Sequence, residues 1–452
     1  MGVHVIVVGA GEVGSYVAAR LSHERHNVSV VDIDANRLRQ VAADLDVLTV
    51  EGSGTHPSVL ADAGIDNCDL VVSVTSKDEV NLVASLIAKQ HGVERTIVRI
   101  ESAELRSRAS SELLQAFRAD LVIDPDRQTA ERILNLLDYP GASEILVMAQ
   151  GEAIVIGARL EAGAPIVGRR LSDLAAEYEP DWEFMVGSIS RGDATYIPRT
   201  DYRLMEGDLV RVVCKRGARR RVASLLGLGT GTARHVLLLG GGHTAEILAA
   251  GLVARGVEVV IVERDAERAL ELAEDLTDVQ VFEGDITDAD LLEEADLGRF
   301  DAVAALTGED EDNILACLYA KSVGVTETIA VVHKLALLSL LDSAGVDVAL
   351  SPRTATADGV MRFVRGDVAA VATFLQSDAE VVELEVEKGS PADNSLVRDL
   401  KLPKGILIGA IVRDGKPHIA RGRSRLRGRD HVVAFATPDS VREVHQLLTC
   451  DE

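Results

Sequence analysis

The sequence has little of several features that mark large classes of protein. Its four cysteines, Cys68, Cys214, Cys317 and Cys450, form no C-x-x-C pair, so we expect isolated thiols in a reducing compartment rather than disulfides or a zinc site. No run approaches the roughly 18–20 apolar residues that a membrane-spanning helix needs. The first apolar run begins at Val3, which leaves no room for a signal peptide. We therefore expect a soluble, intracellular protein.

Lysine is also scarce. Only nine of the 47 basic residues are lysines, and 72 acidic residues bring the net charge to −25. Such a charge repels phosphate backbones and argues against nucleic acid as a partner. The balance resembles that of salt-adapted (halophile) cytosolic proteins, with an ordinary acidic protein as the alternative. Basic runs at 216–221 and 421–429 could contact anionic lipid or an acidic partner, but solvated or carboxylate-paired side chains are the favoured interpretation.

A glycine-rich turn lies between two apolar, β-branched runs near the start of the chain. Gly9, Gly11 and Gly14 have the G-x-G-x-x-G spacing, and Asp32 ends the second run. Gly9 permits a tight turn, Gly11 lets a pyrophosphate approach the backbone, and Gly14 allows close helix–strand packing. The following helix offers its first N–H groups to phosphate, and Asp32 can accept hydrogen bonds from ribose hydroxyls. The pattern predicts adenine-nucleotide binding, and a purely structural turn is the alternative.

Further candidates follow later strands, because the carboxyl ends of parallel strands face the ligand crevice of a doubly wound sheet. Gly52 and Ser53 follow the predicted third strand; they either line an adenine pocket or only form a strand-to-helix turn. Thr75 follows the predicted fourth strand and is a candidate hydroxyl donor to the nucleotide.

Arg99 interrupts the predicted fifth strand at 96–100. A cation at the end of a buried strand needs an anion, and a bound phosphate is the favoured partner. Pairing with Glu101 or Asp78 is the alternative.

The glycine turn recurs in the second half of the chain. Gly240 follows Gly9 by 231 positions, and Glu263 follows Asp32 by the same 231 positions. The chain is therefore interpreted as a tandem duplication. Asp285 and Thr307, the counterparts of Ser53 and Thr75, become candidates for the second site.

The second site differs from the first. Ala245 replaces the third glycine, and Val331 replaces Arg99, so phosphate neutralisation is expected from His333 or Lys334, or not at all. We expect the second site to bind a nucleotide with a different preference. The acidic run 309–312 is interpreted as a helix start favoured by the helix dipole, with a cation site as the alternative.

Each half is longer than one nucleotide-binding unit and ends in a shorter, β-rich stretch. The predicted fold class is α/β: two Rossmann-like, doubly wound parallel-sheet domains, each followed by a small α+β module. A Pro-Gly pair at 140–141 marks the first boundary. The predicted domains are 1–140, 141–228, 232–366 and 367–452.

Longer stretches throughout the chain carry a family resemblance. They include VHVIVVGAGEVG, VVDID, VEGSGTHPSVLADAGI, VVSVTSKDEVNLVAS, YPGA, RHVLLLGGGH, VEVVIVERD, AALTGEDEDNILACLYAK, VDVALSP and LKLPKGILIGAIVRDG. On these stretches the chain resembles the Trk-type potassium-uptake regulatory proteins, which carry two RCK (KTN) units. The resemblance implies that NAD(H), ATP or ADP binds the RCK N-terminal domains. It also implies a homo-oligomeric ring, a dimer of dimers, at the cytoplasmic face of the membrane, which biases the gate of a membrane-embedded potassium transporter subunit.

The resemblance also assigns roles to residues. Asp32 holds ribose, Arg99 meets phosphate, and Glu263 takes the part of Asp32 in the second unit; Glu101 stands where family members often have a second arginine. Phosphate is held by Gly9, Ala10, Gly11, Glu12 and Val13, Val74 and Thr75 lie along the nucleotide, and the second turn comprises Gly240, Gly241, Gly242, His243 and Thr244.

Two other functions remain open: an NAD-dependent oxidoreductase, and an RCK-type sensor of a different cation transporter. An oxidoreductase needs a general acid or base beside the nicotinamide and a substrate pocket in the next domain. The first β-rich module, 141–228, contains no histidine, and no acid–base pair recurs with the duplication. A binding protein without catalytic or metal-ligating residues is therefore the favoured prediction.

Overall fold

The computed structural model of the chain describes residues 3–102, 105, 117–192, 194–229, 231–288, 297–364, 368–373, 379–437 and 440–450. These residues form two compact units. The first comprises residues up to Ala130 together with Leu350–Gly366, and the second comprises Glu131–Ala349 and the residues from Asp367 onward. The first unit is therefore assembled from two distant parts of the chain.

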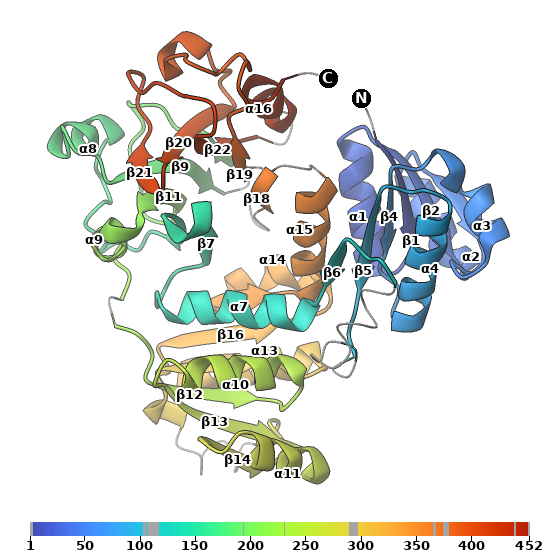
Figure 1. Cartoon of the computed structure of the whole chain (residues 1–452). Coiled ribbons are helices and arrows are strands. Elements are labelled where there is room, and N and C mark those ends of the chain that lie inside the picture. Colours follow the sequence, from blue (N-terminus) through green and yellow to red (C-terminus); the bar gives the residue numbers. More distant parts are fainter. Residues whose placement is uncertain are drawn as a thin grey trace. The chain divides into compact units, whose positions relative to one another are not determined.

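A six-stranded parallel sheet forms the centre of the first unit (Figure 1), with strand order β3-β2-β1-β4-β5-β6. The order reverses between β1 and β4, which places a ligand crevice at the carboxyl ends of these strands. The strands are β1 (His4–Val8), β2 (Asn27–Asp32), β3 (Leu48–Glu51), β4 (Leu70–Ser73), β5 (Arg95–Arg99) and β6 (Leu121–Ile123).

Helices cover both faces of this sheet. Val5 and Val7 of β1 pack with α1 and α2, whereas Ile6 and Val8 pack with α3 and α4. This division explains why β1 is an unbroken apolar run: alternate side chains are buried on opposite faces. The covering helices are α1 (Glu12–His23), α2 (Ala35–Asp44), α3 (Pro57–Asp62) and α4 (Asp78–Gln90), with a short 3₁₀ turn η1 (Ile65–Asn67). Helix α7 (Pro125–Leu137) follows β6 and continues into the second unit.

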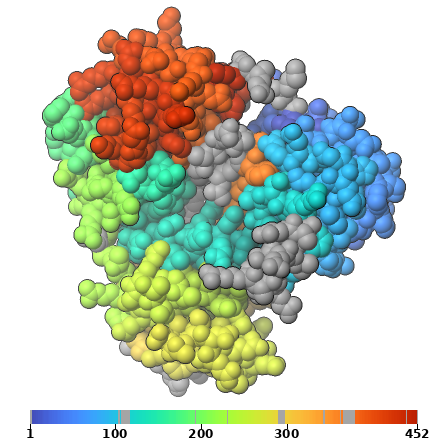
Figure 2. Space-filling view, in the orientation of Figure 1, coloured from blue at the N-terminus to red at the C-terminus, as the bar shows by residue number. Residues whose placement is uncertain are grey.

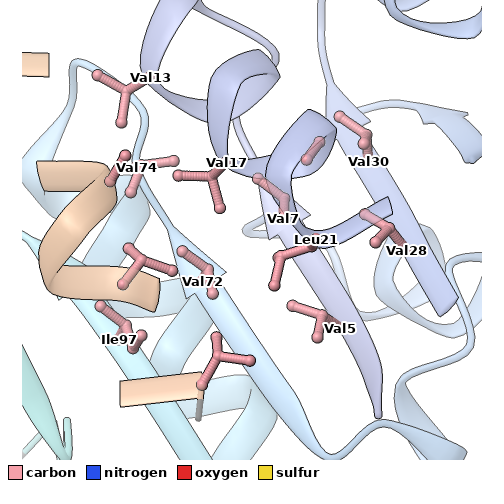
Figure 3. Packing of buried hydrophobic residues seen from close by; sticks show 14 of the residues in the cluster. Val5, Val7, Val13, Val17, Leu21, Val28, Val30, Val72, Val74 and Ile97 are labelled. Carbon is pink, nitrogen blue, oxygen red and sulfur yellow. The ribbon is translucent and has the colours of Figure 1, made fainter. Parts of the chain in front are cut away.

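Helix α15 (Pro352–Val364) comes from the second repeat but packs on the first sheet. Ala357, Val360, Met361 and Val364 join the core formed by α1 and the strands. Figure 3 shows this helix, drawn in pale orange, beside Val72, Val74 and Ile97. Arg95 donates from Nη1 to the carbonyl oxygens of Phe363 and Val364, both at 3.4 Å, and so binds the carboxyl end of the helix. The corresponding helix of the first repeat, α7, brings Leu134 against Gly251 in the second unit.

The second unit contains the second parallel sheet, with order β14-β13-β12-β15-β16-β17. The order matches that of the first sheet, so the structure confirms the duplicated α/β fold that the sequence predicts. The strands are β12 (His235–Leu239), β13 (Glu258–Glu263), β14 (Val279–Glu283), β15 (Ala302–Ala305), β16 (Glu327–Val331) and β17 (Val348–Leu350). The helices are α10 (His243–Val253), α11 (Ala266–Asp275), α13 (Asp310–Ser322) and α14 (Leu335–Ala344), with a 3₁₀ turn η5 (Leu297–Arg299).

Two small modules complete the second unit, each built on a five-stranded sheet, with orders β10-β9-β11-β8-β7 and β18-β19-β22-β20-β21. The first contains β7 (Glu144–Met148), β8 (Ala153–Arg159), β9 (Phe184–Arg191), β10 (Ala194–Tyr196), β11 (Leu209–Lys215), α8 (Leu171–Glu177) and α9 (Arg219–Leu225). The second contains β18 (Val368–Thr373), β19 (Glu380–Glu385), β20 (Ile406–Arg413), β21 (Lys416–Ile419), β22 (His431–Ala436) and α16 (Val441–Leu448). Their short 3₁₀ turns are η3 (Ala149–Gly151), η4 (Arg216–Ala218) and η6 (Val397–Leu400).

The two modules share one core. Val155 and Val213 of the first module pack with Val381, Val412 and Phe435 of the second. Figure 2 shows the second module, in red, lying directly against the first, in green. The modules also repeat an internal ion pair. Asp208 binds Arg191 in one and Asp430 binds Arg413 in the other, so the two aspartates are equivalent in the two modules.

Some details differ from the sequence predictions. The sequence predicts that the stretch 400–405 matches an element of the first module, but residues 401–405 form no helix or strand. Strands β18 and β19 have no counterpart among the predicted elements. The domain boundaries themselves remain a prediction.

Candidate functional site

A cavity of about 850 Å³ lies at the carboxyl ends of the first sheet's strands. Its walls come from the glycine turn, from Asp32, from the turn at 52–54 and from the ends of β4 and β5. The volume falls within the range of about 300–1,000 Å³ found for small-molecule sites. The cavity lies at the switch point of the strand order, where doubly wound sheets bind their ligands.

The glycine turn has the geometry that its spacing predicts. Gly9 has φ +110°, and a Cβ there would lie only 3.1 Å from the backbone nitrogen of Thr75. A Cβ on Gly14 would collide with the carbonyl oxygen of Gly9. Gly11 begins α1 without a side-chain capping hydrogen bond, so the first N–H groups of the helix are available to an anion in the cavity.

Asp32 fixes the turn from the end of β2. Its Oδ2 accepts from Ala10 N at 2.6 Å, and its Oδ1 accepts from Asp34 N at 2.8 Å. A carboxylate oxygen can accept two hydrogen bonds, so each Asp32 oxygen can still accept one from a ligand hydroxyl. Asp32 lines the cavity.

Asn81 of α4 fixes the position of Thr75 through hydrogen bonds. Asn81 Oδ1 accepts from the Thr75 nitrogen and hydroxyl, at 2.9 and 2.7 Å, and Asn81 Nδ2 donates to the Thr75 and Arg99 carbonyls. This fully buried amide therefore joins the ends of β4 and β5. The detectable signal was an asparagine six positions after a threonine in both repeats, at 75 and 81 and at 307 and 313.

Arg99 lines the cavity and forms an ion pair with Glu101 through Nη2. Its buried Nε has no hydrogen-bond partner among the described residues. Burial lowers the pKa of Arg99, against the opposing effect of Asp78 and Asp126, but an arginine remains charged. Asp78 itself accepts from Glu101 N and Ser102 N, at 3.0 and 2.8 Å. The alternative of Glu101 pairing is therefore observed, and a phosphate contact of Arg99 stays a prediction.

The remaining candidates of the first site also reach the cavity. Gly52, Ser53 and Val74 line it, as do Glu12 and Val13. Gly52 N donates to the Asp32 carbonyl at 2.9 Å, and the Ser53 hydroxyl lies 2.8 Å from that of Thr55. The turn at 52–54 therefore supports the end of β2 and lines the cavity, and contact with an adenine stays a prediction.

Arg353 lines the same cavity, which sequence reasoning did not anticipate. It is the second residue of α15, and it forms an ion pair with Glu12. No local motif marks this residue, because it reaches the cavity only through the packing of α15 on the first sheet.

The second glycine turn repeats the backbone geometry. Gly240 has φ +101°, and Glu263 Oε2 accepts from Gly241 N at 2.6 Å, as Asp32 does from Ala10. A Cβ on Gly241 would lie 2.5 Å from Leu272 Cδ1 and 3.0 Å from Glu263 Oε2, so a larger residue there would crowd both side chains. Asn313 holds Thr307 as Asn81 holds Thr75.

The charged groups of the second site are engaged differently. Arg268 donates to the Gly241 carbonyl at 3.0 Å and to Glu246 at 2.8 Å, which links α11 to the glycine turn and α10. Asp310 accepts from His333 N and Lys334 N, at 2.7 and 2.8 Å. Gly242 is the N-cap residue of α10, and Thr244 is the second residue of this helix.

Three side chains named for this site have protein partners. His333 binds Asp310, Lys334 Nζ binds Glu311 at 2.7 Å, and His243 lies 3.4 Å from Glu246. Asp285 accepts from the nitrogen and hydroxyl of Thr287, and these bonds lower the pKa of Asp285. The acidic run at 309–312 lies at the start of α13, as predicted, and two of its side chains bind His333 and Lys334 in the loop after β16.

Other chemistry is weakly represented. Among the residues that the structure describes, no helix is long and apolar enough to cross a membrane, and no three His, Cys, Asp or Glu side chains gather as a metal site. Cys68, Cys214 and Cys317 are buried, whereas Cys450 is exposed. Burial raises the pKa of the Cys68 thiol to about 11 and those of Cys214 and Cys317 to about 12, which makes these thiols poor nucleophiles.

The fold and the first site define a duplicated Rossmann-type protein, in which each parallel-sheet domain is followed by a small module. Comparison with protein families gives the same division: the TrkA-N domain matches residues 5–125 and 236–352, and the TrkA-C domain matches residues 155–227 and 381–449. The Trk system potassium uptake proteins TrkA of Azorhizobium caulinodans and Halomonas elongata are each 32% identical, over 98% of both chains. The chain belongs to the Trk system potassium uptake protein TrkA family.

Solved structures show the same fold. The GsuK RCK domain superposes with a TM-score of 0.61 at 16% identity, covering 99% of this chain and 95% of that one. The GsuK channel bound to NAD gives the same TM-score and identity, covering 99% of this chain and 79% of that one.

Proposed function

We propose that this chain is the nucleotide-responsive regulatory subunit of a Trk-type potassium uptake system. Family membership supports the potassium uptake system, since relatives matching nearly the whole chain are named for it. The main support for nucleotide binding is the first cavity, where Asp32 presents a carboxylate beside the glycine turn and its helix N–H groups. These two elements suit the ribose and the phosphates of one ligand.

The proposed ligand is an adenine nucleotide, NAD(H) or ATP/ADP. A carboxylate at the end of the second strand accepts from ribose hydroxyls and repels a 2′-phosphate, so NADP is disfavoured at both Asp32 and Glu263. A solved relative in fold, the GsuK channel, binds NAD, which supports the dinucleotide.

The composition of the cavity supports the proposal of binding rather than catalysis. The described residues that line it include no histidine or cysteine to serve as a nucleophile or proton shuttle. We propose instead that the ligand changes the conformation of the assembly through its different affinity for two states. Steady turnover of NADH by purified protein with 2-hydroxy or amino acids would revive the oxidoreductase alternative.

The proposed partner is a membrane-embedded potassium transporter subunit, contacted at the cytoplasmic face of the membrane by a homo-oligomeric ring. The net charge of −25 argues against nucleic acid as a partner. The second site is proposed to bind a nucleotide with a different preference, because Val331 replaces Arg99 and Arg268 already occupies the turn carbonyl of Gly241.

Substitution of Asp32 tests the first site directly. Asp32→Ala removes a charge-assisted acceptor for ribose, worth about 1.5–3 kcal/mol, so the Kd for ATP, ADP or NADH should rise by about 10–100-fold in calorimetry. Asp46→Ala, an exposed acid outside the cavity, is the matched control and should leave the affinity unchanged. Unchanged affinity in Asp32→Ala would refute the assignment.

The partner is tested by pull-down from solubilised membranes, with and without ATP, using the full chain as bait. Recovery of a multi-spanning potassium transporter that depends on the nucleotide supports the proposal. Recovery of a different cation carrier would transfer the function to that carrier.

A further inference from the structure

The charged side chains that line the first cavity include Glu12, Arg99 and Arg353, and the last of these comes from the other half of the chain. Glu12 and Arg99 belong to the first repeat, whereas Arg353 begins α15 of the second. The Arg353 side chain is 24% exposed, and burial lowers its pKa. A mostly buried guanidinium at a cavity wall requires an anionic partner.

Glu12 is that partner in this structure, and its position matters. It is the first residue of α1, directly after Gly11, so its carboxylate lies at the helix N-terminus. A phosphate bound by the glycine turn would lie at the same helix N-terminus. Glu12 and a phosphate would therefore compete for one guanidinium, and a phosphate has the geometry that binds arginine through two hydrogen bonds.

The charged trio is specific to the first site. In the second repeat His243 stands at the position of Glu12, and Val331 at that of Arg99. Aligning Pro125 with Pro352 places Asp126, an acid, at the position of Arg353. The residue types at all three aligned positions therefore differ between the two repeats.

We propose that Arg353 is a phosphate ligand of the first nucleotide site, supplied by the second repeat, and that the bound phosphates displace Glu12 from it. This inference rests on the proposed nucleotide binding and adds a residue to it. The ligand class is a nucleotide with at least two phosphates, or the pyrophosphate of a dinucleotide. Adenosine, which has no phosphate, gains nothing from Arg353.

Calorimetric titration of the full chain with ATP, ADP and adenosine tests the assignment. Arg353→Gln should weaken ATP and ADP binding by about 10–100-fold, the effect of losing charge-assisted hydrogen bonds, and leave adenosine binding unchanged. Glu12→Gln should strengthen ATP binding, because it removes the competing carboxylate. In the double variant the gain in ATP affinity from Glu12→Gln should disappear, because the Arg353 guanidinium for which Glu12 and phosphate compete is absent.

Arg127→Gln is the matched control. Arg127 is two residues after Pro125 in α7, is 61% exposed and pairs with Asp124, and it does not line the cavity. Its substitution should change no affinity. Thermal unfolding without ligand checks that Arg353→Gln retains the fold.

The outcomes separate this inference from the proposed function. If the wild-type chain binds no adenine compound, the proposed function falls and takes this inference with it. Only the role of Arg353 is overturned if the wild type binds ATP and Arg353→Gln binds it equally well. The same holds if Arg353→Gln loses as much affinity for adenosine as for ATP. If Glu12→Gln fails to strengthen ATP binding, the displacement of Glu12 is overturned.

Discussion

Glu327, the first residue of β16, makes stability depend on pH. Its side chain is buried, at 1% exposure, and neither carboxylate oxygen has a hydrogen-bond partner among the described residues. Burial, followed by the charge of Asp347, raises its pKa from 4.5 to about 8, while Lys321 opposes the shift. The folded protein therefore retains this proton up to about pH 8, whereas the unfolded chain releases it near pH 4.5.

The sign follows from proton linkage. Between these two pH values the folded state binds more protons, so the free energy of unfolding falls as the pH rises. At pH 7 the cost is on the order of 3 kcal/mol, from about 1.4 kcal/mol for each pH unit above the unfolded pKa. Glu327→Gln keeps the size of the side chain and removes the titration. The variant should match the wild type near pH 4.5 and become progressively more stable than it up to pH 8.

Amide hydrogen exchange of peptides from β15 and β16, followed by mass spectrometry between pH 5 and 8, measures the local free energy of opening. Glu258→Gln is the control: this acid begins β13 of the same sheet, its side chain is 82% exposed, and its substitution should not alter the pH slope. Equal slopes in the wild type and Glu327→Gln would refute the reasoning.

Two further predictions concern the supports of the first site. Asn81→Ala removes three hydrogen bonds to Thr75 and one to Arg99, and it should lower the free energy of unfolding by about 3 kcal/mol, as should Asn313→Ala in the second sheet. Chemical denaturation that shows a loss of less than about 1 kcal/mol would contradict this. Met361→Ala in α15 should cost about 2–4 kcal/mol and accelerate hydrogen exchange in α1, despite the distance in sequence, and acceleration confined to the second parallel sheet would count against the packing described here.

Much of the fold follows from local patterns. Apolar runs such as 5–8 and 236–239, each ended by a glycine, define parallel strands buried on both faces, and the repeat of 231 residues transfers the pattern to the second half. Small and apolar residues on one face of the stretch 79–90 predict a helix, which is α4 (Asp78–Gln90) in the structure, and the six-stranded order recurs in both sheets. Gly9 and Asp32 occupy the expected places because their roles depend on backbone geometry that the motif itself dictates.

The rest depends on packing between distant segments, which a single sequence does not display. Arg353 has no motif, because α15 brings it to the cavity by burying Met361 and its neighbours on the first sheet. Arg268 of α11 donates to the second glycine turn and to Glu246 of α10. Arg268 and Glu246 lie 22 positions apart in the sequence, so no local pattern reveals this contact. The shared core of the two small modules cannot be predicted from the sequence either. The strands bury apolar residues on both faces, and the pattern does not show which face contacts the other module.

The placement of α15 has a consequence for dissecting the protein. A fragment that ends at residue 228 would retain the whole first glycine turn but lose the helix that covers Val72, Val74 and Ile97. That bare hydrophobic face would need a helix from another molecule, so the isolated half should pair with a second copy or precipitate. Joining both halves in one polypeptide makes the first sheet self-sufficient.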